Sequence, residues 1–184
     1  MSEGEDELRA LMLQYQGGSL DAFQAVYARL APDLRRFLCH LTRSFDGADD
    51  LLQETFLQMH RSRASYNPAY AVRPWLFGLA RNVFLMNRRA LQRWNTVHEI
   101  RPDLPDSAVP PEVERLGASD EIRRRVAGLS ADQAEVLLLR HEWGFSFEEI
   151  AGMLGVSPAA ARARASRGIA ELRVSLNGFH RLKT

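Results

Sequence analysis

The feature that most constrains the fold is a pair of helix-start signals separated by a glycine, in the last quarter of the chain. Ser146 precedes an apolar-periodic run and Glu149 follows three residues later, a spacing that lets each side chain satisfy the other's end of a helix start. Gly155 stands where this helix should end, because glycine takes the left-handed conformation without a steric penalty. Ser157 and Pro158 then mark the start of a second helix. These signals predict a helix-turn-helix.

The predicted second helix is rich in alanine and arginine. Between Ser157 and Arg173 it carries four arginines against one acidic residue, a local charge near +3. Arginine offers forked donors that fit phosphates and the major-groove edge of guanine, and small side chains let a helix backbone approach its partner. An alanine-rich helix that merely faces solvent is the competing interpretation. The coincidence of a capped first helix, a glycine turn and a basic second helix favours DNA binding.

Composition argues against several other classes. The 184 residues are 46% hydrophobic and 26% charged with a net charge of +1, as in ordinary globular proteins. The N-terminus is acidic and no apolar run is long enough for a bilayer, so we expect a cytoplasmic protein without membrane contact. Cys39 is the only cysteine, and its neighbour His40 lacks the further ligands of a structural zinc site. We expect no metal and no cofactor. Without a phosphate loop, a nucleophile elbow or paired carboxylates, we expect no enzymatic activity.

Charge and proline content divide the chain. Residues 96–118 hold four prolines with five acidic and two basic residues, which is typical of a linker. Residues 55–98 hold seven arginines and no Asp or Glu, which indicates a second nucleic-acid surface. We therefore predict an all-α fold of two small helical domains joined by a flexible linker. The N-terminal domain is residues 1–95, and the C-terminal domain is residues 119–184 with the helix-turn-helix.

Apolar periodicity predicts the helices of both domains. In the N-terminal domain these are a helix over 6–15 that stops at Gly17 and Gly18, one from Ser19 that kinks or restarts at Pro32, one over 46–61, and one from Pro74. Residues 63–73 are expected to be a loop, because Asn67 precedes a proline. In the C-terminal domain, helices over 119–129 and from Ser130 precede the helix-turn-helix.

Two surfaces leave their role open at this point. The helix over 46–61 turns Asp50, Gln53, Glu54 and Leu57 outward, which periodicity alone explains as a solvated polar face. Tyrosines and a tryptophan beside the arginine-rich helix can stack on unpaired bases while the arginines hold the backbone. Ordinary core packing is the alternative, and it is the one we favour for Trp75.

Three motifs occur in an order that resembles a known family. Residues 49–56, DDLLQETF, resemble the D-L-x-Q-E-T-F signature of the extracytoplasmic-function (ECF) group of bacterial RNA polymerase sigma factors. Residues 73–82, RPWLFGLARN, resemble the family's R-x-W-L-x-x-I-A-x-N segment, and residues 146–167 resemble its region 4 helix-turn-helix. The resemblance extends over nearly the whole chain and comprises a region 2 and a region 4 domain.

The resemblance implies a role for each motif. The first would dock on the clamp helices of the polymerase β′ subunit, the second would recognise and open the −10 promoter element, and the third would bind the −35 element. The implied polymerase-binding residues are Asp49, Asp50, Leu51, Gln53, Glu54, Phe56 and Leu57. The implied −10 residues are Tyr66, Asn67, Arg73, Trp75, Arg81, Asn82, Arg88 and Arg89. The implied −35 residues are Ser157, Ala160, Arg162, Ala163, Arg164, Ser166 and Arg167.

The resemblance also implies an anti-sigma factor that holds the protein inactive. Among the −35 residues, Arg162 and Arg167 would reach bases or phosphates and Arg164 would hold phosphate. Gly168 is expected to interrupt the recognition helix.

Two other classes remain open: a stand-alone helix-turn-helix regulator, and a decoy or partner-switch protein that binds polymerase but not promoters.

Overall fold

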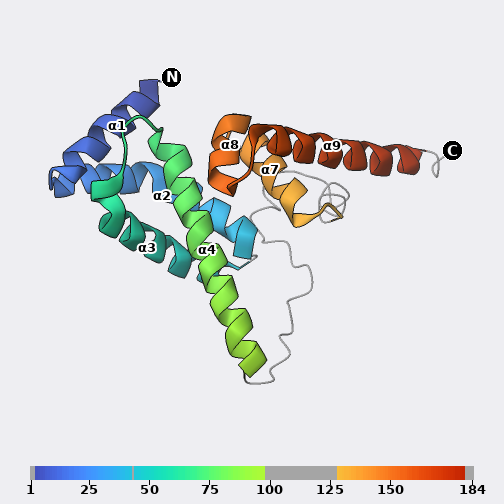
Figure 1. Ribbon diagram of the computed structural model, residues 1–184, viewed down its shortest axis with the longest axis horizontal. Coiled ribbons are helices and arrows are strands. Elements are labelled where there is room, and N and C mark those ends of the chain that lie inside the picture. The colour runs from blue at the N-terminus through green and yellow to red at the C-terminus, as the bar shows by residue number, and fades with distance from the viewer. Residues whose placement is uncertain (1–2, 43, 98–127, 181–184) are drawn as a thin grey trace. The chain divides into compact units, whose positions relative to one another are not determined.

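The structure is a computed structural model that describes residues 3–42, 44–97 and 128–180, and every element in these ranges is helical. The chain divides into two compact units, Met1–Pro110 and Pro111–Thr184, which are coloured along the chain in Figure 1. The predicted all-α class is confirmed. Most of the predicted linker and of the predicted helix over 119–129 lies outside the described residues.

The N-terminal unit contains four helices and one short 3₁₀ turn in its described part. They are α1 (Glu3–Gln16), α2 (Leu20–Thr42), α3 (Phe45–Ser62), the 3₁₀ turn η1 (Arg63–Ser65) and α4 (Val72–Val97). The predicted boundary between α1 and α2 is confirmed, since Gly18 has a φ of 100° and the Ser19 hydroxyl accepts from the Ala22 amide at 3.2 Å. The loop predicted over 63–73 is η1 followed by residues 66–71.

The helix α2 continues through Pro32, so of the kink or restart expected there, the restart does not occur. Proline removes one i→i−4 hydrogen bond from a helix. Pro32 is exposed, as is Ala28, whose carbonyl loses its helical donor. That carbonyl lies on the solvent-facing side of α2, where water can satisfy it.

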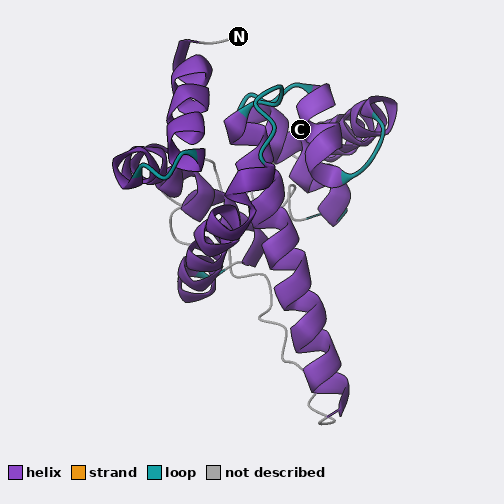
Figure 2. Cartoon of the chain, turned by 60° about the vertical axis from the view of Figure 1, so that its left-hand side comes forward, coloured by secondary structure: helices purple, strands orange, loops and turns teal. Residues whose placement is uncertain are grey.

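Aromatic and leucine side chains from all four helices form the core of the N-terminal unit. Phe37 of α2 and Phe77 of α4 are fully buried, with ring centroids 5.1 Å apart. The inner face of α4 ends at Val83, and residues 86–94 are all exposed. Figures 1 and 2 both show the last turns of α4 running beyond the helices that pack on its first half. This exposed half carries Arg88 and Arg89.

The C-terminal unit consists, in its described part, of α7 (Ala131–His141), α8 (Phe147–Leu154) and α9 (Pro158–His180). Ser146 and Glu149 form the predicted capping box: the Glu149 amide donates to the Ser146 hydroxyl at 3.2 Å, and the Ser146 amide donates to the Glu149 carboxylate at 2.7 Å. Gly155 is left-handed, with a φ of 67°. The predicted helix-turn-helix is confirmed.

Gly168 does not interrupt α9, which is one helix of 23 residues. Gly168 is buried against α7, where a Cβ atom would lie 2.9 Å from Leu137 Cδ1 and 3.3 Å from Gln133 Cβ. The expectation was wrong because the glycine meets a packing constraint that periodicity does not reveal: it lets α9 lie close to α7.

No described helix combines the length and apolarity needed to cross a membrane.

Candidate polymerase and nucleic-acid interfaces

The outer face of α9 presents most of the predicted −35 residues. Ala161, Ala165 and Gly168 are buried against α7 and α8. The residues exposed on the other faces are Arg162, Ala163, Ser166 and Arg167, while Ala160 and Arg164 are partly buried. Ser157 is exposed and caps the helix, because its hydroxyl accepts from the Ala160 amide at 3.1 Å.

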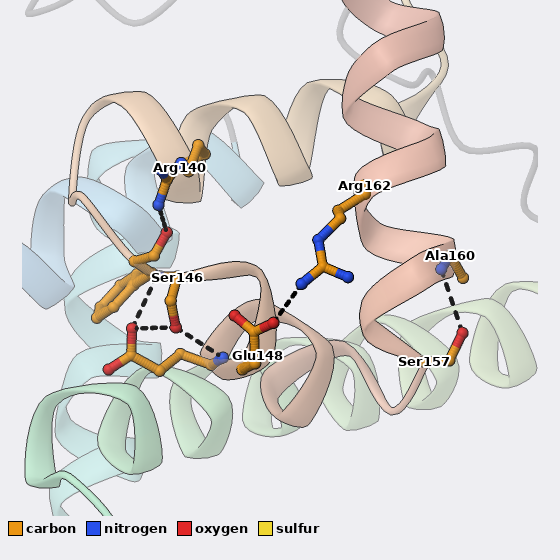
Figure 3. A network of polar contacts seen from close by, with 8 residues as sticks. Arg140, Ser146, Glu148, Ser157, Ala160 and Arg162 are labelled. Carbon is orange, nitrogen blue, oxygen red and sulfur yellow. Dashed lines mark hydrogen bonds and ion pairs between the residues drawn. The ribbon is translucent and has the colours of Figure 1, made fainter.

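The guanidinium of Arg162 is directed back to the start of α8. It donates to the Glu148 carboxylate, as Figure 3 shows, and it lies 5.7 Å from the centre of the Phe147 ring. In a helix-turn-helix the first helix crosses the DNA backbone while the second enters the groove. Arg162 is therefore oriented to reach a phosphate beside α8 more readily than a base edge below α9.

The other two predicted arginines of α9 differ in their surroundings. Arg164 pairs with Asp132 of α7 at 3.0 Å, and only 25% of its side chain is exposed. Its charge is thus partly offset within the unit, contrary to a simple phosphate-holding role. Arg167 is exposed and has no ion pair among the described residues, so it is the better placed of the two to bind an external anion.

The predicted polymerase-binding residues of α3 divide between two faces. Asp50, Gln53 and Leu57 are exposed, and the side chain of Glu54, 47% exposed, pairs with Arg61 at 3.2 Å. Two members of the motif are buried instead. These are Leu51 and Phe56, which are 6% and 5% exposed. The motif wraps around the helix, so these two residues of the predicted contact surface face the core in the structure.

Asp49 is fixed in place by Arg35 of α2. The guanidinium donates to both carboxylate oxygens, from Nε at 2.5 Å and from Nη2 at 3.1 Å, and it lies over the Phe45 ring. The hydrogen bond from Arg35 holds the pKa of Asp49 below its usual value. Asp49 thereby ties the start of α3 to α2 and stays charged at neutral pH.

An exposed tyrosine lies beside this face, at a position that helical spacing alone would place in the core. Tyr27 of α2 is 43% exposed, and its ring centroid is 4.6 Å from that of Phe56. Tyrosine combines an apolar ring with a polar end that prefers water, so helical spacing does not distinguish a core position from a partly exposed one. Leu57, 51% exposed, adds a second apolar side chain on the exterior of α3.

The loop of residues 66–71 has one buried aromatic side chain and one exposed. Tyr66 is only 4% exposed, its ring lies 5.0 Å from that of Trp75, and its hydroxyl donates to the Tyr70 carbonyl at 2.6 Å. Tyr66, one of the predicted −10 residues, is buried and supports the loop from inside. Tyr70 is 67% exposed and was missing from the predicted set; it is the loop aromatic that a base can reach.

The remaining predicted −10 residues follow the loop into α4. Asn67 is exposed and organises the loop, since its side-chain oxygen accepts from the Ala69 amide at 2.9 Å. Arg73 is directed to Asp33 of α2 at 3.1 Å, and Trp75 is partly buried, as the core interpretation expected. The exposed members are Asn82, Arg88 and Arg89, with Arg81 partly buried.

Comparison with known proteins identifies the family. The Sigma-70 region 2 model matches residues 26–94, and the Sigma-70 region 4 model matches residues 119–172. The RNA polymerase sigma factor CarQ of Myxococcus xanthus is 37% identical over 166 residues, which cover 88% of this chain and 93% of CarQ. The ECF RNA polymerase sigma factor EcfG of Rhodopseudomonas palustris is 30% identical over 77% of each chain.

The chain belongs to the ECF group of the sigma-70 family. This sigma factor is also similar to a solved structure, the sigma factor RpoE in complex with the anti-sigma factor NepR from Bartonella quintana. The TM-score is 0.68 at 25% identity, and the match covers 86% of this chain and 98% of the other. In this sigma factor α3, the loop and most of α4 lie within the region 2 match, whereas α1 precedes it.

Proposed function

We propose that this ECF sigma factor binds core RNA polymerase through the exterior of α3, captures the −10 element with the loop 66–71 and α4, and binds the −35 element with α9. The observation that carries the proposal is the coincidence of exposure with motif. Exposed polar side chains of α3, α4 and α9 fall on the three stretches that resemble the family's binding segments, and the exposed loop 66–71 directly precedes the second stretch.

The polymerase contact is assigned to Asp50, Gln53, Glu54 and Leu57, with the β′ clamp helices as the partner. These side chains form a mixed polar and apolar exterior on one rigid helix, which suits a helical partner surface. The buried Leu51 and Phe56 position α3 and do not touch the polymerase.

The −10 contact is assigned to the exposed loop and the arginines of α4. Taking a base out of the duplex costs a few kcal/mol, and stacking on an aromatic ring returns about 1–3 kcal/mol per base. Tyr70 supplies an exposed ring, and Asn67 and Asn82 supply exposed amide groups. Arg88 and Arg89 lie further along α4, where their charges attract the DNA backbone.

The −35 contact is assigned to α9. Ala163 and Ser166 lie on its outer face and allow close approach to the groove, while Arg162 and Arg167 bind phosphates. Ser157 and Ala160 fix the start of the helix, and Arg164 ties it to α7 through Asp132. Phosphate binding by arginine releases counterions, so the affinity should fall steeply with salt.

The partners proposed for the whole chain are core polymerase, promoter DNA and an anti-sigma factor. RpoE of Bartonella quintana was solved with the anti-sigma factor NepR, and its similarity to this chain supports an inhibitor of that kind here. The site of action is then the cytoplasm, where polymerase and promoters are found.

The test is in vitro transcription with bacterial core polymerase, the purified chain and a library of upstream fragments from its own genome. Specific transcripts that share a −35 and −10 pair are expected. Tight core binding without transcripts would instead identify a decoy or partner-switch protein. Binding to duplex DNA without any core binding would identify a stand-alone regulator.

A further inference from the structure

The helix α1 is hydrogen-bonded to both ends of the −10 loop. At the start of the loop, the side-chain amide of Gln16 donates to the Arg63 carbonyl at 2.7 Å and to the Tyr66 carbonyl at 2.9 Å. At the far end, the carboxylate of Glu5 accepts from the Val72 amide. Gln16 and Glu5 are at opposite ends of α1, so one rigid helix holds both ends of the loop.

The two attachments bind backbone groups at both ends of the loop, and the one at the far end satisfies an amide that no regular element satisfies. Val72 is the first residue of α4, and the amides of a first helical turn have no intrahelical acceptor. A carboxylate at that position also interacts favourably with the helix dipole. The Gln16 amide uses both of its hydrogens on the carbonyls of Arg63, which begins η1, and of Tyr66, which follows it. These bonds fix where the chain leaves η1, and the Glu5 bond fixes where it enters α4.

The part of the loop between the attachments is the part that DNA would meet. Residues 67–70 are all exposed. They are braced from within, because the Tyr70 amide donates to the Asn67 carbonyl at 3.0 Å and the Tyr66 hydroxyl donates to the Tyr70 carbonyl. A loop fixed at its ends and braced within has little conformational freedom left to lose when a base binds.

We propose that Gln16 and Glu5 are positioning residues for −10 capture: from α1, they hold the loop 66–71 in the conformation that receives the unpaired base. This inference rests on the proposed −10 role of the loop. Neither residue needs to touch DNA, and the effect of each is transmitted through the backbone groups that it binds.

The first measurement is hydrogen exchange on the full chain, with Gln16→Glu and Gln16→Leu. Both variants remove the two donors, and Gln16→Lys restores donors at a similar reach. Gln14→Glu, on the exposed face of the same helix, is the matched control for charge. Faster exchange at Tyr70 and Val72 is expected for the first two variants alone, by roughly three- to thirtyfold if one to two hydrogen bonds of ordinary strength are lost. Unchanged exchange would overturn the proposal.

The second measurement uses the holoenzyme on a promoter that the wild-type protein transcribes, with permanganate reactivity of −10 thymines as the probe of opening. Gln16→Glu and Gln16→Leu should slow opening by roughly three- to thirtyfold, while the affinity of the closed complex stays unchanged. Gln16→Lys should open at nearly the wild-type rate.

Three results of the opening assay would count against the positioning role. They are equal opening rates in all variants, faster loop exchange without slower opening, and a parallel loss of closed-complex affinity, which indicates a general folding defect. If the wild-type holoenzyme opens no promoter, the proposed function fails. The exchange measurement then still decides whether α1 holds the loop.

Discussion

Replacing Gly168 by alanine tests whether close packing, and not flexibility, explains a glycine in the middle of α9. The new Cβ would lie 2.9 Å from Leu137 Cδ1 and 3.3 Å from Gln133 Cβ, whereas carbon atoms in favourable contact are about 3.5–4.0 Å apart. The Leu137 methyl group can move by rotation. The Gln133 Cβ moves only with the α7 backbone, and that shift also strains the 2.7 Å bond from Gln133 to Glu171.

The magnitude follows from two opposing contributions. Overpacking typically costs about 1–3 kcal/mol, and alanine is favoured over glycine inside a helix by about 1 kcal/mol. Gly168→Ala should therefore lower the free energy of unfolding of the C-terminal unit by up to about 2 kcal/mol. Gly152→Ala is the matched control, because Gly152 lies inside α8 with nothing within 4 Å of its Cβ position. It should raise stability by up to about 1 kcal/mol.

The assay is native-state hydrogen exchange in the full chain, followed at amides of α7 and α9, with thermal unfolding alongside. Both variants share the same helix-propensity gain, so the difference between them isolates the packing cost at about 1–3 kcal/mol. For a domain of this size, each kcal/mol of that difference lowers the melting temperature of Gly168→Ala relative to Gly152→Ala by about 4–8 °C. If Gly168→Ala were as stable as Gly152→Ala, the packing argument would be refuted.

Three further outcomes are expected. Arg162→Ala should weaken promoter binding and reduce the slope of log affinity against log salt concentration by about one phosphate contact. Arg29→Ala, on α2, should leave this slope unchanged. An equal change of slope in both variants would contradict the assignment. Glu54→Lys should weaken core polymerase binding in a pull-down or titration, whereas Glu7→Lys, which breaks a comparable surface ion pair with Arg29, should not; normal core affinity for Glu54→Lys would move the interface elsewhere. Burial raises the pKa of Glu5 above its ordinary value. The Val72 and Arg73 amides and the charges of Arg73 and Arg9 oppose this rise without cancelling it. The Glu5 carboxyl group therefore binds its proton more tightly in the native state than in the unfolded state. Its contribution to stability is present below the unfolded pKa and is lost as pH rises through the folded pKa. Glu5→Gln keeps an acceptor for the Val72 amide without the charge. It should flatten this decline in unfolding experiments as the pH rises above the ordinary glutamate pKa of about 4.3; a decline as steep as in the wild type would contradict the assignment to Glu5.

Local signals in the sequence predicted the helix-turn-helix well. The capping box of Ser146 and Glu149 and the left-handed Gly155 depend on residues within one turn of each other, so spacing alone identifies them. The motif over 49–56 was harder to interpret, because a contiguous motif on a helix covers all of its faces. Periodicity alone turned Leu57 outward, whereas the motif also placed Phe56 on the contact surface; the structure buries Phe56 and exposes Leu57.

The contacts that hold the −10 loop were beyond the reach of sequence patterns. Gln16 meets Arg63 and Tyr66 across 47 and 50 residues of chain, and nothing in the periodicity of α1 distinguishes Gln16 from Gln14. Tyr66 and Tyr70 likewise look equivalent in the sequence, although the first is buried and the second exposed. Which aromatic faces solvent is decided by where η1 directs the chain and by Trp75, which packs on the Tyr66 ring.

The length of α4 sets a fixed distance between two proposed DNA contacts. The helix is continuous from Val72, where the loop ends, to Val97. At 1.5 Å per residue, Arg88 lies about 24 Å along the axis from Val72, which equals the rise of about seven base pairs of duplex DNA at 3.4 Å each. For DNA that follows α4, the helix therefore fixes the spacing between the two proposed contacts. Arg88 and Arg89 meet the DNA backbone at a set number of base pairs from the base that the loop binds. Inserting residues into the exposed half of α4 would move Arg88 and Arg89 along the DNA without altering the loop 66–71.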